Sequence, residues 1–394
     1  MSAWKPAAGH RRLLYAGALV PALVVGLGLW NPLNRADARG GPEAPRFRVD
    51  PFWPKPLPVD AASGKPWVTG EVAGTCVDSK DHVITVNRGF STGGLVAPET
   101  VVATASPPVV EYDREGNVAN AWGIPSVLPN GIHGCFVDYQ DNVWIAGNGD
   151  GIVQKYSHDG GTLLLQIGTR GTCDSPTGAC GNFGLVGNST TLLNQPADVA
   201  VDPGNGDIYI ADGYGNHRVV VFDRNGTYLR QWGGVVTNNA APEPGSFAAG
   251  DGGHPHCVVL GNDDLVYVCD RADDRIQVFD KAGNLQRIIA VKPGTGVTPH
   301  ADGSPGLGTA GSAWDLDFSG DRHQTFMFEV DGGNERLWTM DRRLGVILSG
   351  FGRPGHAAGE FTFVHTVAVD SRGNLYTGET IGGRRIQKFR PVGH

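Results

Sequence analysis

Residues 197–233 read ADVAVDPGNGDIYIADGYGNHRVVVFDRNGTYLRQWG. Short runs rich in Val, Ile, Tyr and Phe alternate with clusters of Asp, Gly, Asn and Pro. This pattern predicts four β-strands joined by tight turns. One such sheet cannot bury both of its faces alone, so the segment predicts an architecture in which neighbouring copies pack against each other.

Altered copies of this unit recur along the chain at intervals of roughly 50–65 residues, the spacing of a β-propeller blade. The fold class is therefore predicted to be all-β, a six-bladed β-propeller. The last copy has only three clear strands, and residues 46–49 are expected to add its outer strand and close the ring. The six copies begin near Val72, His133, Ala197, His256, Trp314 and His365.

Composition agrees with a globular protein made of strands and turns. The chain has 394 residues, of which 59 are glycine and 26 proline, with 40% hydrophobic and 18% charged residues. These values exclude a disordered or collagen-like chain. The net charge of −8 argues against a nucleic-acid partner.

The first 38 residues differ from the rest. Arg11 and Arg12 precede an uncharged apolar run over 13–30, and a small-residue cleavage signal follows at 36–38. We interpret residues 1–38 as a signal peptide, with an uncleaved membrane anchor as the alternative. Residues 39–69 then form a proline-rich lead-in and 70–394 the propeller, and the protein is exported to a periplasmic or extracellular location.

The chain has six cysteines, and disulfides between them can persist in an exported protein. Cys173 and Cys180 bracket a short polar loop and are predicted to form a disulfide. The other four lie in apolar strand-like runs and are expected to be buried thiols. These four are Cys76, Cys135, Cys257 and Cys269.

One column of the repeat carries histidine in alternate copies. Five residues before the turn that follows each first strand, blades two, four and six have His133, His256 and His365, whereas blades one, three and five have Ala73, Ala197 and Trp314. Alternate blades of a six-bladed ring are related by a pseudo-threefold axis, so the three imidazoles are expected to converge on the channel. Three histidines with an open fourth position favour catalytic zinc, with copper, iron or nickel as alternatives.

Arg88, Tyr214 and Arg271 occupy strand ends expected at the same mouth of the channel. An arginine fork binds a carboxylate, and a phenol beside a metal and two cations is suited to act as a base. Ordinary strand-end ion pairing, for example of Arg271 with a neighbouring aspartate, is the alternative. The histidines outside the column are expected at the surface, namely His217, His254, His323 and His356.

From about residue 70 to 392 the chain resembles peptidyl-α-hydroxyglycine α-amidating lyase, the propeller half of peptidylglycine α-amidating monooxygenase, and more broadly the NHL-repeat propellers. The resemblance is carried by QPADVAVDPGNGDIYIADGYGNHRVVVF, PHCVVLGNDDLVYVCDRADDRIQVF and HTVAVDSRGNLYTGE. It implies a catalytic zinc on His133, His256 and His365, a base at Tyr214 and substrate-binding arginines at Arg88 and Arg271.

The implied reaction cleaves the N–C bond of a carbinolamide and releases glyoxylate and an amide. The family's structural calcium site is only partly matched in this sequence, which makes bound calcium doubtful. Its aspartate after the third histidine is Thr366 here, and only main-chain carbonyls such as those of Thr75 and Cys135 match. The family's bridging cysteines are also absent, since Gly215 and Val278 stand at those positions.

Together these observations predict an exported, metal-dependent, lyase-like monomer acting on a small-molecule or peptide-derived substrate. Two alternatives differ in class. One is a non-catalytic NHL propeller whose rim binds a protein or a glycan. The other is a three-histidine oxidoreductase or hydrolase, which redox-active copper or iron would favour over zinc.

Overall fold

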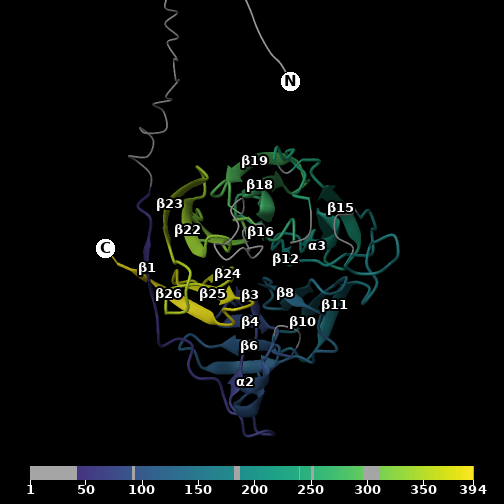
Figure 1. The fold of residues 1–394 in the computed structure, drawn as a ribbon. Helices are drawn as coiled ribbons and strands as arrows, with labels where there is room; N and C mark the ends of the chain where they lie inside the picture. The colour runs from purple at the N-terminus through teal and green to yellow at the C-terminus, as the bar shows by residue number, and fades with distance from the viewer. Residues whose placement is uncertain are drawn as a thin grey trace, which may run out of the picture. The chain divides into compact units, whose positions relative to one another are not determined.

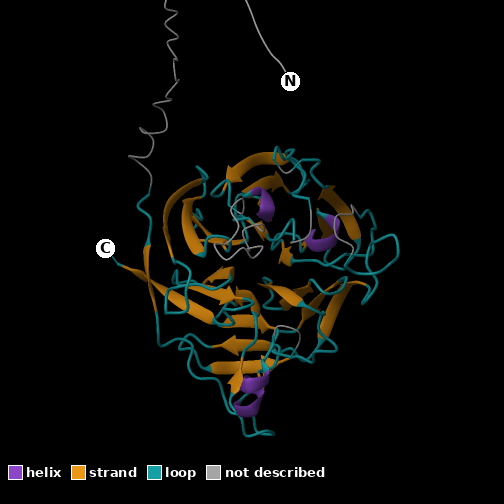
Figure 2. Ribbon diagram, viewed as in Figure 1, coloured by secondary structure: helices purple, strands orange, loops and turns teal. Residues whose placement is uncertain are grey.

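A computed structural model describes residues 42–90, 94–181, 187–238, 240–249, 253–295 and 311–393. The predicted leader at 1–38 lies outside these ranges. Strands dominate the described chain, and the helices are short (Figure 2). None of the helices in the described ranges has the length and hydrophobicity of a membrane span.

Six four-stranded antiparallel sheets follow one another around a common centre, which confirms the predicted propeller (Figure 1). Blade 1 contains β3 (Val72–Val77), β4 (Val83–Asn87), β6 (Val109–Tyr112) and β7 (Val118–Trp122). Blade 2 contains β8 (Ile132–Val137), β9 (Val143–Gly147), β10 (Ile152–Tyr156) and β11 (Leu163–Gly168). Blade 3 contains β12 (Asp198–Val201), β13 (Ile208–Asp212), β14 (Arg218–Phe222) and β15 (Tyr228–Gly233).

The remaining three blades repeat this order. Blade 4 contains β16 (Val258–Leu260), β17 (Leu265–Asp270), β18 (Arg275–Asp280) and β19 (Leu285–Ala290). Blade 5 contains β20 (Asp315–Phe318), β21 (Phe326–Asp331), β22 (Arg336–Asp341) and β23 (Val346–Phe351). Blade 6 contains β24 (Val364–Val369), β25 (Leu375–Glu379), β26 (Ile386–Val392) and β1 (Arg46–Val49).

The ring is closed as predicted by β1, which pairs antiparallel with β26 and supplies the outer strand of blade 6. The register places Arg46 opposite Val392. Phe47 of this strand reaches blade 5, where its ring centroid lies 5.5 Å from that of Phe328 and 5.7 Å from that of Phe351. The N-terminal strand therefore joins two blades as well as completing one.

Smaller elements lie between and beside the blades. The segment between β4 and β6 contains α2 (Ala97–Val102) and β5 (Thr104–Ala105), and β5 pairs in parallel with β2 (Trp67–Val68). A short helix α3 (Gly213–Asn216) follows β13, and a 3-10 turn η2 (Arg271–Asp273) follows β17. The last two elements occupy equivalent positions in blades 3 and 4.

The apolar core is divided among the boundaries between blades. The described residues form six buried clusters, one at each boundary around the ring. The cluster between blades 2 and 3, for example, packs Trp144 and Val153 against Val199, Ile210 and Phe222. Each sheet thus buries its two faces against its two neighbours, which is why an isolated copy of the repeat is not expected to fold.

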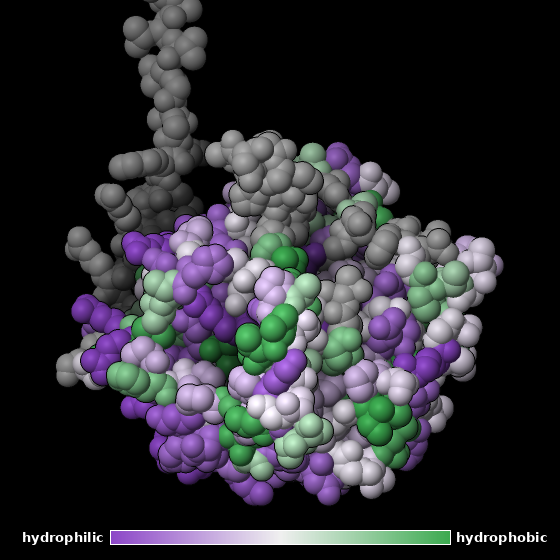
Figure 3. All heavy atoms as spheres, turned by 60° about the horizontal axis from the view of Figure 1, so that its bottom comes forward, coloured by the Kyte–Doolittle hydropathy of each residue, from purple (hydrophilic) through white to green (hydrophobic). Residues whose placement is uncertain are grey.

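The face of the molecule shown in Figure 3 carries hydrophobic side chains in small groups among hydrophilic ones. The exposed apolar residues of the described chain are spread over many elements, as Phe52, Val101, Ile124 and Leu164 illustrate. Apolar residues scattered in this way are ordinary for a soluble surface.

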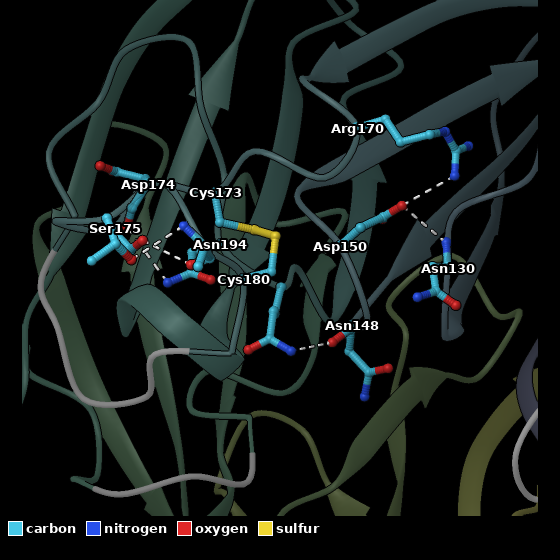
Figure 4. Close-up of a disulfide and its surroundings, with 12 residues drawn as sticks. Asn130, Asn148, Asp150, Arg170, Cys173, Asp174, Ser175, Cys180 and Asn194 are labelled. Carbon is cyan, nitrogen blue, oxygen red and sulfur yellow. Dashed lines mark hydrogen bonds and ion pairs between the residues drawn. A yellow bond between two sulfur atoms is a disulfide. The ribbon is translucent and has the colours of Figure 1, made fainter.

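Three disulfides are present instead of the single predicted one. Cys173–Cys180 forms as predicted and closes the loop drawn in Figure 4, near Asp150, which accepts bonds from Arg170 and Asn130. The prediction of four buried thiols was wrong, because these cysteines meet in space. The additional pairs are Cys76–Cys135, between the innermost strands β3 and β8, and Cys257–Cys269, across the antiparallel pair β16 and β17.

The closing strand gives a test of the fold. We expect Phe47→Ala to lower the free energy of unfolding by about 2 kcal/mol, less than for a fully buried ring because Phe47 is only half-buried. Arg48→Ala, in the same strand but exposed, is the control and is expected to change stability little. Urea unfolding of the two variants measures the difference, and equal losses would contradict a packing role for β1.

Candidate metal centre

The three column histidines come together at one end of the channel. His133 and His365 are each the second residue of the innermost strand of their blade, and His256 lies two residues before β16. Their ring centroids are 4.6–4.9 Å apart, and one nitrogen from each lies within 4.8 Å of the others. All three side chains are buried.

Each histidine is oriented by the blade that follows it. Nδ1 lies 2.8 Å from the carbonyl of Ala197 for His133, 2.6 Å from that of Trp314 for His256, and 2.9 Å from that of Ala73 for His365. A carbonyl oxygen can only accept, so each Nδ1 carries the proton and donates it. The alternate column positions thus act as acceptors, and in the neutral rings Nε2 keeps a free lone pair.

The surroundings keep these rings neutral. Burial, followed by the charges of His365 and Arg88, lowers the pKa of His133 well below its usual value. Burial and the charge of Arg271 do the same to His256, and burial with both arginines lowers the pKa of His365 to about 3. Nε2 of His256 is buried without a hydrogen-bond partner. Three neutral imidazoles with inward lone pairs, one of them unsatisfied, fit a metal ion.

Tyr214 stands beside this cluster on α3. Its hydroxyl lies 3.0 Å from Nε2 of His133 and donates to it. The helix backbone packs so closely that a Cβ on Gly213 would lie 1.8 Å from the Pro255 carbonyl oxygen, and one on Gly215 would lie 2.1 Å from the Asn194 side chain. The glycines on both sides of Tyr214 therefore allow the phenol to reach the histidines.

Arg88 is held in place by several partners. Its guanidinium forms a 2.9 Å ion pair with Glu71 and donates to the carbonyl of Ile132, the residue before His133, at 2.9 Å. A longer bond of 3.3 Å reaches Oδ1 of Asn148, whose carbonyl accepts from Gln195. Asn148 is labelled in Figure 4. No pattern in the sequence pointed to Glu71, Asn148 or Gln195, because they belong to different loops.

Arg271 is buried on η2, and its guanidinium carbon lies 4.5 Å from the Trp314 ring centroid and 6.0 Å from that of Tyr214. The neighbouring carboxylates of Asp270 and Asp273 are ion-paired with Arg275, at 2.7 and 3.4 Å. Arg271 thus lies over aromatic rings beside the histidines.

A cavity of about 260 Å³ runs along the innermost strands and contains the three histidines at its wall. Half-buried aspartates of blades 3 and 5 also line it. Oδ2 of Asp198 accepts from the backbone of Val258 at 3.0 Å, and that of Asp315 from Val367 at 2.9 Å. Burial raises the pKa of Asp198 to about 7. Each of these carboxyl groups is thus hydrogen-bonded to the next blade around the ring, as each channel histidine is.

Thr366, which stands where the resembled family has a calcium-binding aspartate, is paired with another neutral side chain. Thr366 donates to the hydroxyl of Thr75 at 3.0 Å between β24 and β3. Two hydroxyls bonded to each other supply no carboxylate for a hard cation.

Two of the four histidines expected at the surface are buried instead. His217 and His254 are almost fully buried, with ring centroids 6.2 Å apart. The turns that contain them pack beneath α3 and beside Pro255, which the local sequence did not reveal. His323 and His356 are exposed as predicted.

Comparison with known proteins finds similarity to the proteins that the sequence motifs resemble. Residues 193–222 match the NHL repeat. The chain is 32% identical over 350 residues to peptidyl-glycine alpha-amidating monooxygenase A of Xenopus laevis, covering 82% of this chain and 32% of that protein. It is 27% identical over 272 residues to peptidyl-alpha-hydroxyglycine alpha-amidating lyase 2 of Drosophila melanogaster, covering 68% and 55%.

NHL repeat-containing protein 3 of Mus musculus is 26% identical over 369 residues, covering 89% of this chain and 85% of that one. The chain thus spans about a third of the Xenopus protein and most of the mouse protein. Among solved structures, a streptogramin B lyase aligns with a TM-score of 0.50 at 13% identity, over 88% of this chain and 98% of that one. At this identity the likeness concerns the fold alone.

The histidine cluster predicts a specific loss of metal. Because His256 contributes one of three converging nitrogens, His256→Ala is expected to lower the transition-metal content of the purified, tag-free protein by about one ion per chain. His323→Ala removes an exposed histidine and serves as the control. Metal analysis by mass spectrometry measures both, and an unchanged content in His256→Ala would refute the site.

Gly253 provides a second test at the same place. It has a φ of +74°, and a Cβ on it would lie 2.8 Å from Tyr214 and 2.9 Å from His256. We expect Gly253→Ala to displace one of these rings and to weaken metal binding at least tenfold, with a loss of stability of about 1 kcal/mol or more from the positive φ. Gly373→Ala, also at positive φ but in open space, controls for backbone strain. Equal metal affinities in the two variants would contradict the expectation.

Proposed function

We propose that this NHL-repeat six-bladed β-propeller, a distant relative of the amidating lyases, is an exported metal-dependent lyase. Its reaction would cleave the N–C bond of a carbinolamide of the peptidyl-α-hydroxyglycine type. The observation that supports this most directly is the arrangement of three neutral imidazoles around one point, with a tyrosine hydroxyl 3.0 Å from one of their nitrogens.

His133, His256 and His365 would hold the metal through Nε2. When bound, a zinc ion supplies Lewis-acid polarisation of a substrate oxygen. The arrangement leaves room for this role because, within the described ranges, three protein ligands converge, whereas a structural zinc site is closed by four. The carbonyls of Ala197, Trp314 and Ala73 keep the rings oriented throughout the reaction.

Tyr214 is the proposed general base. Acting as a phenolate, its Oη takes the proton from the substrate hydroxyl, the carbon–oxygen bond becomes a carbonyl, and the N–C bond breaks with its electron pair moving to the amide nitrogen. The same phenol then returns the proton to that nitrogen. The products are glyoxylate and an amide, and the step needs no oxidant, reductant or water.

The substrate carboxylate is assigned to an arginine. Arg88 already binds Glu71 and the Ile132 carbonyl, so we assign to it the role of fixing the strand that carries His133. Arg271 lies over Trp314 and near Tyr214, where a carboxylate bound to its guanidinium would stand next to the base. Binding of the carboxylate at Arg271 would thereby orient the substrate hydroxyl toward Tyr214.

Three disulfides support an exported location, since disulfides persist outside the reducing cytosol. The proposed partner is a small-molecule or peptide-derived substrate, and the proposed state is a monomer that binds no nucleic acid.

The non-catalytic alternative is favoured by one specific finding. The mouse NHL repeat-containing protein 3 covers this chain more completely than the amidating enzymes do, and its name states no activity. A propeller that binds a protein or a glycan at its rim would keep the fold and the histidines without turnover.

The activity test is release of glyoxylate from an α-hydroxyglycine amide by the metal-loaded protein. We expect Tyr214→Phe to lower the rate by about 10²–10⁴-fold, because the variant lacks the proton acceptor but keeps the ring. Tyr139→Phe, at an exposed tyrosine, is the matched control. No release by the wild-type protein, with the metal content intact, would refute the lyase and favour the non-catalytic alternative.

A further inference from the structure

A second group of histidines and carboxylates lies where blades 1 and 2 meet. Asp78 follows the last residue of β3 and His82 precedes β4, while Glu111 lies in β6 and His158 in the turn between β10 and β11. The column residue Ala73 lies at the other end of β3, about 16 Å away along the strand. This group is therefore separate from the three-histidine cluster.

One carboxylate oxygen of this group has no hydrogen-bond partner. The Asp78 side chain is fully buried, and its Oδ1 accepts from the backbone of Lys80 and His82 at 2.8 and 2.7 Å. Its Oδ2 accepts no hydrogen bond. A buried carboxylate oxygen in this state is costly unless a positive charge lies beside it.

The equivalent aspartates of other blades are satisfied by donors. Asp138 binds Lys155 and Trp144, both at 2.9 Å, and Asp202 binds Lys281 at 2.7 Å. Asp370 accepts from Asn374 and Tyr376. Beside Asp78 of blade 1, histidine nitrogens stand in the place of these donors. Asp78 therefore differs from the aspartates at the same position of the repeat in other blades.

The His158 ring faces the carboxylates with its accepting nitrogen. Nδ1 lies 2.9 Å from the carbonyl of Asp141 and therefore donates to it. In the neutral ring, Nε2 then points a lone pair at Oδ2 of Asp78, 3.4 Å away, and at Oε1 of Glu111, 3.5 Å away. Oε1 of Glu111 lies 2.6 Å from Nδ1 of His82 and accepts a hydrogen bond from it, whereas Oδ2 of Asp78 has no such donor. The lone pair of His158 and Oδ2 of Asp78 therefore repel each other unless a cation lies beside them.

The separations match a coordination shell. Metal–ligand bonds of 2.0–2.2 Å in a tetrahedral site place neighbouring ligand atoms about 3.3–3.6 Å apart. The two distances from His158 fall in this range, and Nδ1 of His82 lies 3.9 Å from Asp78 and 2.6 Å from Glu111. The ligand atoms of Asp78, His82 and Glu111 all lie within 4.8 Å of one another, and the His82–Glu111 pair would have to move apart to admit an ion.

We propose that Asp78, His82, Glu111 and His158 form a second metal site, which takes a divalent transition ion of the zinc class. Two imidazoles and two carboxylates suit such an ion, and its charge balances the two carboxylates. Four protein ligands close the coordination shell, so the role is structural. The ion joins blade 1 to blade 2 at the boundary that Cys76–Cys135 also bridges.

His82 and His158 are each about a quarter exposed, which gives an ion a route from solvent. The site does not depend on the lyase proposal, because it shares no residue with the three-histidine cluster. Metal binding here and glyoxylate release there can fail independently.

The test uses tag-free, disulfide-intact protein carrying His256→Ala, which disables the channel cluster. After removal of metal with a chelator, Zn²⁺ is titrated against a fluorescent competitor. We expect one ion per chain in His256→Ala and in His256→Ala/His323→Ala. The affinity should fall at least tenfold in His256→Ala/His158→Ala. His158→Gln replaces His158→Ala if the latter does not fold.

Equal zinc affinity with and without His158, or no zinc bound by His256→Ala, would overturn the proposal. His158→Ala alone provides the reciprocal measurement, because it should lose one ion per chain and keep the ion of the channel cluster. Thermal unfolding adds a further readout. Zn²⁺ should raise the melting temperature of His256→Ala, and this shift should disappear in the His158 double variant.

Discussion

Each imidazole of the channel is held by the carbonyl of the next blade, and this inter-blade hydrogen bond is the interaction on which the site depends. No blade contains both the donor and its acceptor, as His365 and Ala73 show most clearly, since they are 292 residues apart. The bond between them exists only because the ring closes. The chemistry at the channel is therefore tied to the packing of the sheets.

That packing comes from apolar clusters at every blade boundary. The polar groups of the channel add hydrogen bonds that run, in each case, from one blade to the next blade around the ring. Histidines of even-numbered blades donate to carbonyls of odd-numbered blades. Asp198 and Asp315 of odd-numbered blades accept from backbone amides of even-numbered ones. This alternation supplies hydrogen-bond partners to most of the described polar groups that line the channel, with Nε2 of His256 as an exception, and it gives the ring a threefold pattern within six similar sheets.

The two ends of the innermost strands carry different chemistry. At one end neutral imidazoles converge beside Tyr214 and two arginines, in a site with few protein ligands and an adjacent cavity, which suits turnover. At the other end, aspartates follow the innermost strands of blades 1, 2, 3 and 6, and in blades 2, 3 and 6 they bind lysine, tryptophan, tyrosine or asparagine side chains. In blade 1 histidines replace these donors, and the second metal site is proposed there.

Much of this protein was determined by its sequence alone. The spacing of strands and turns predicted six blades and the closing strand β1, and the repeat placed three histidines in one column, because a residue at a fixed point of a repeated unit has a fixed place in the ring. Tertiary structure alone decided that the other four cysteines pair, that His217 and His254 are buried, that Arg88 binds Glu71, and that Asp78 meets His158. These contacts join residues at unequal positions of the repeat, some within one blade and some between blades. No period in the sequence relates them, and only the packing of the folded chain brings them within reach.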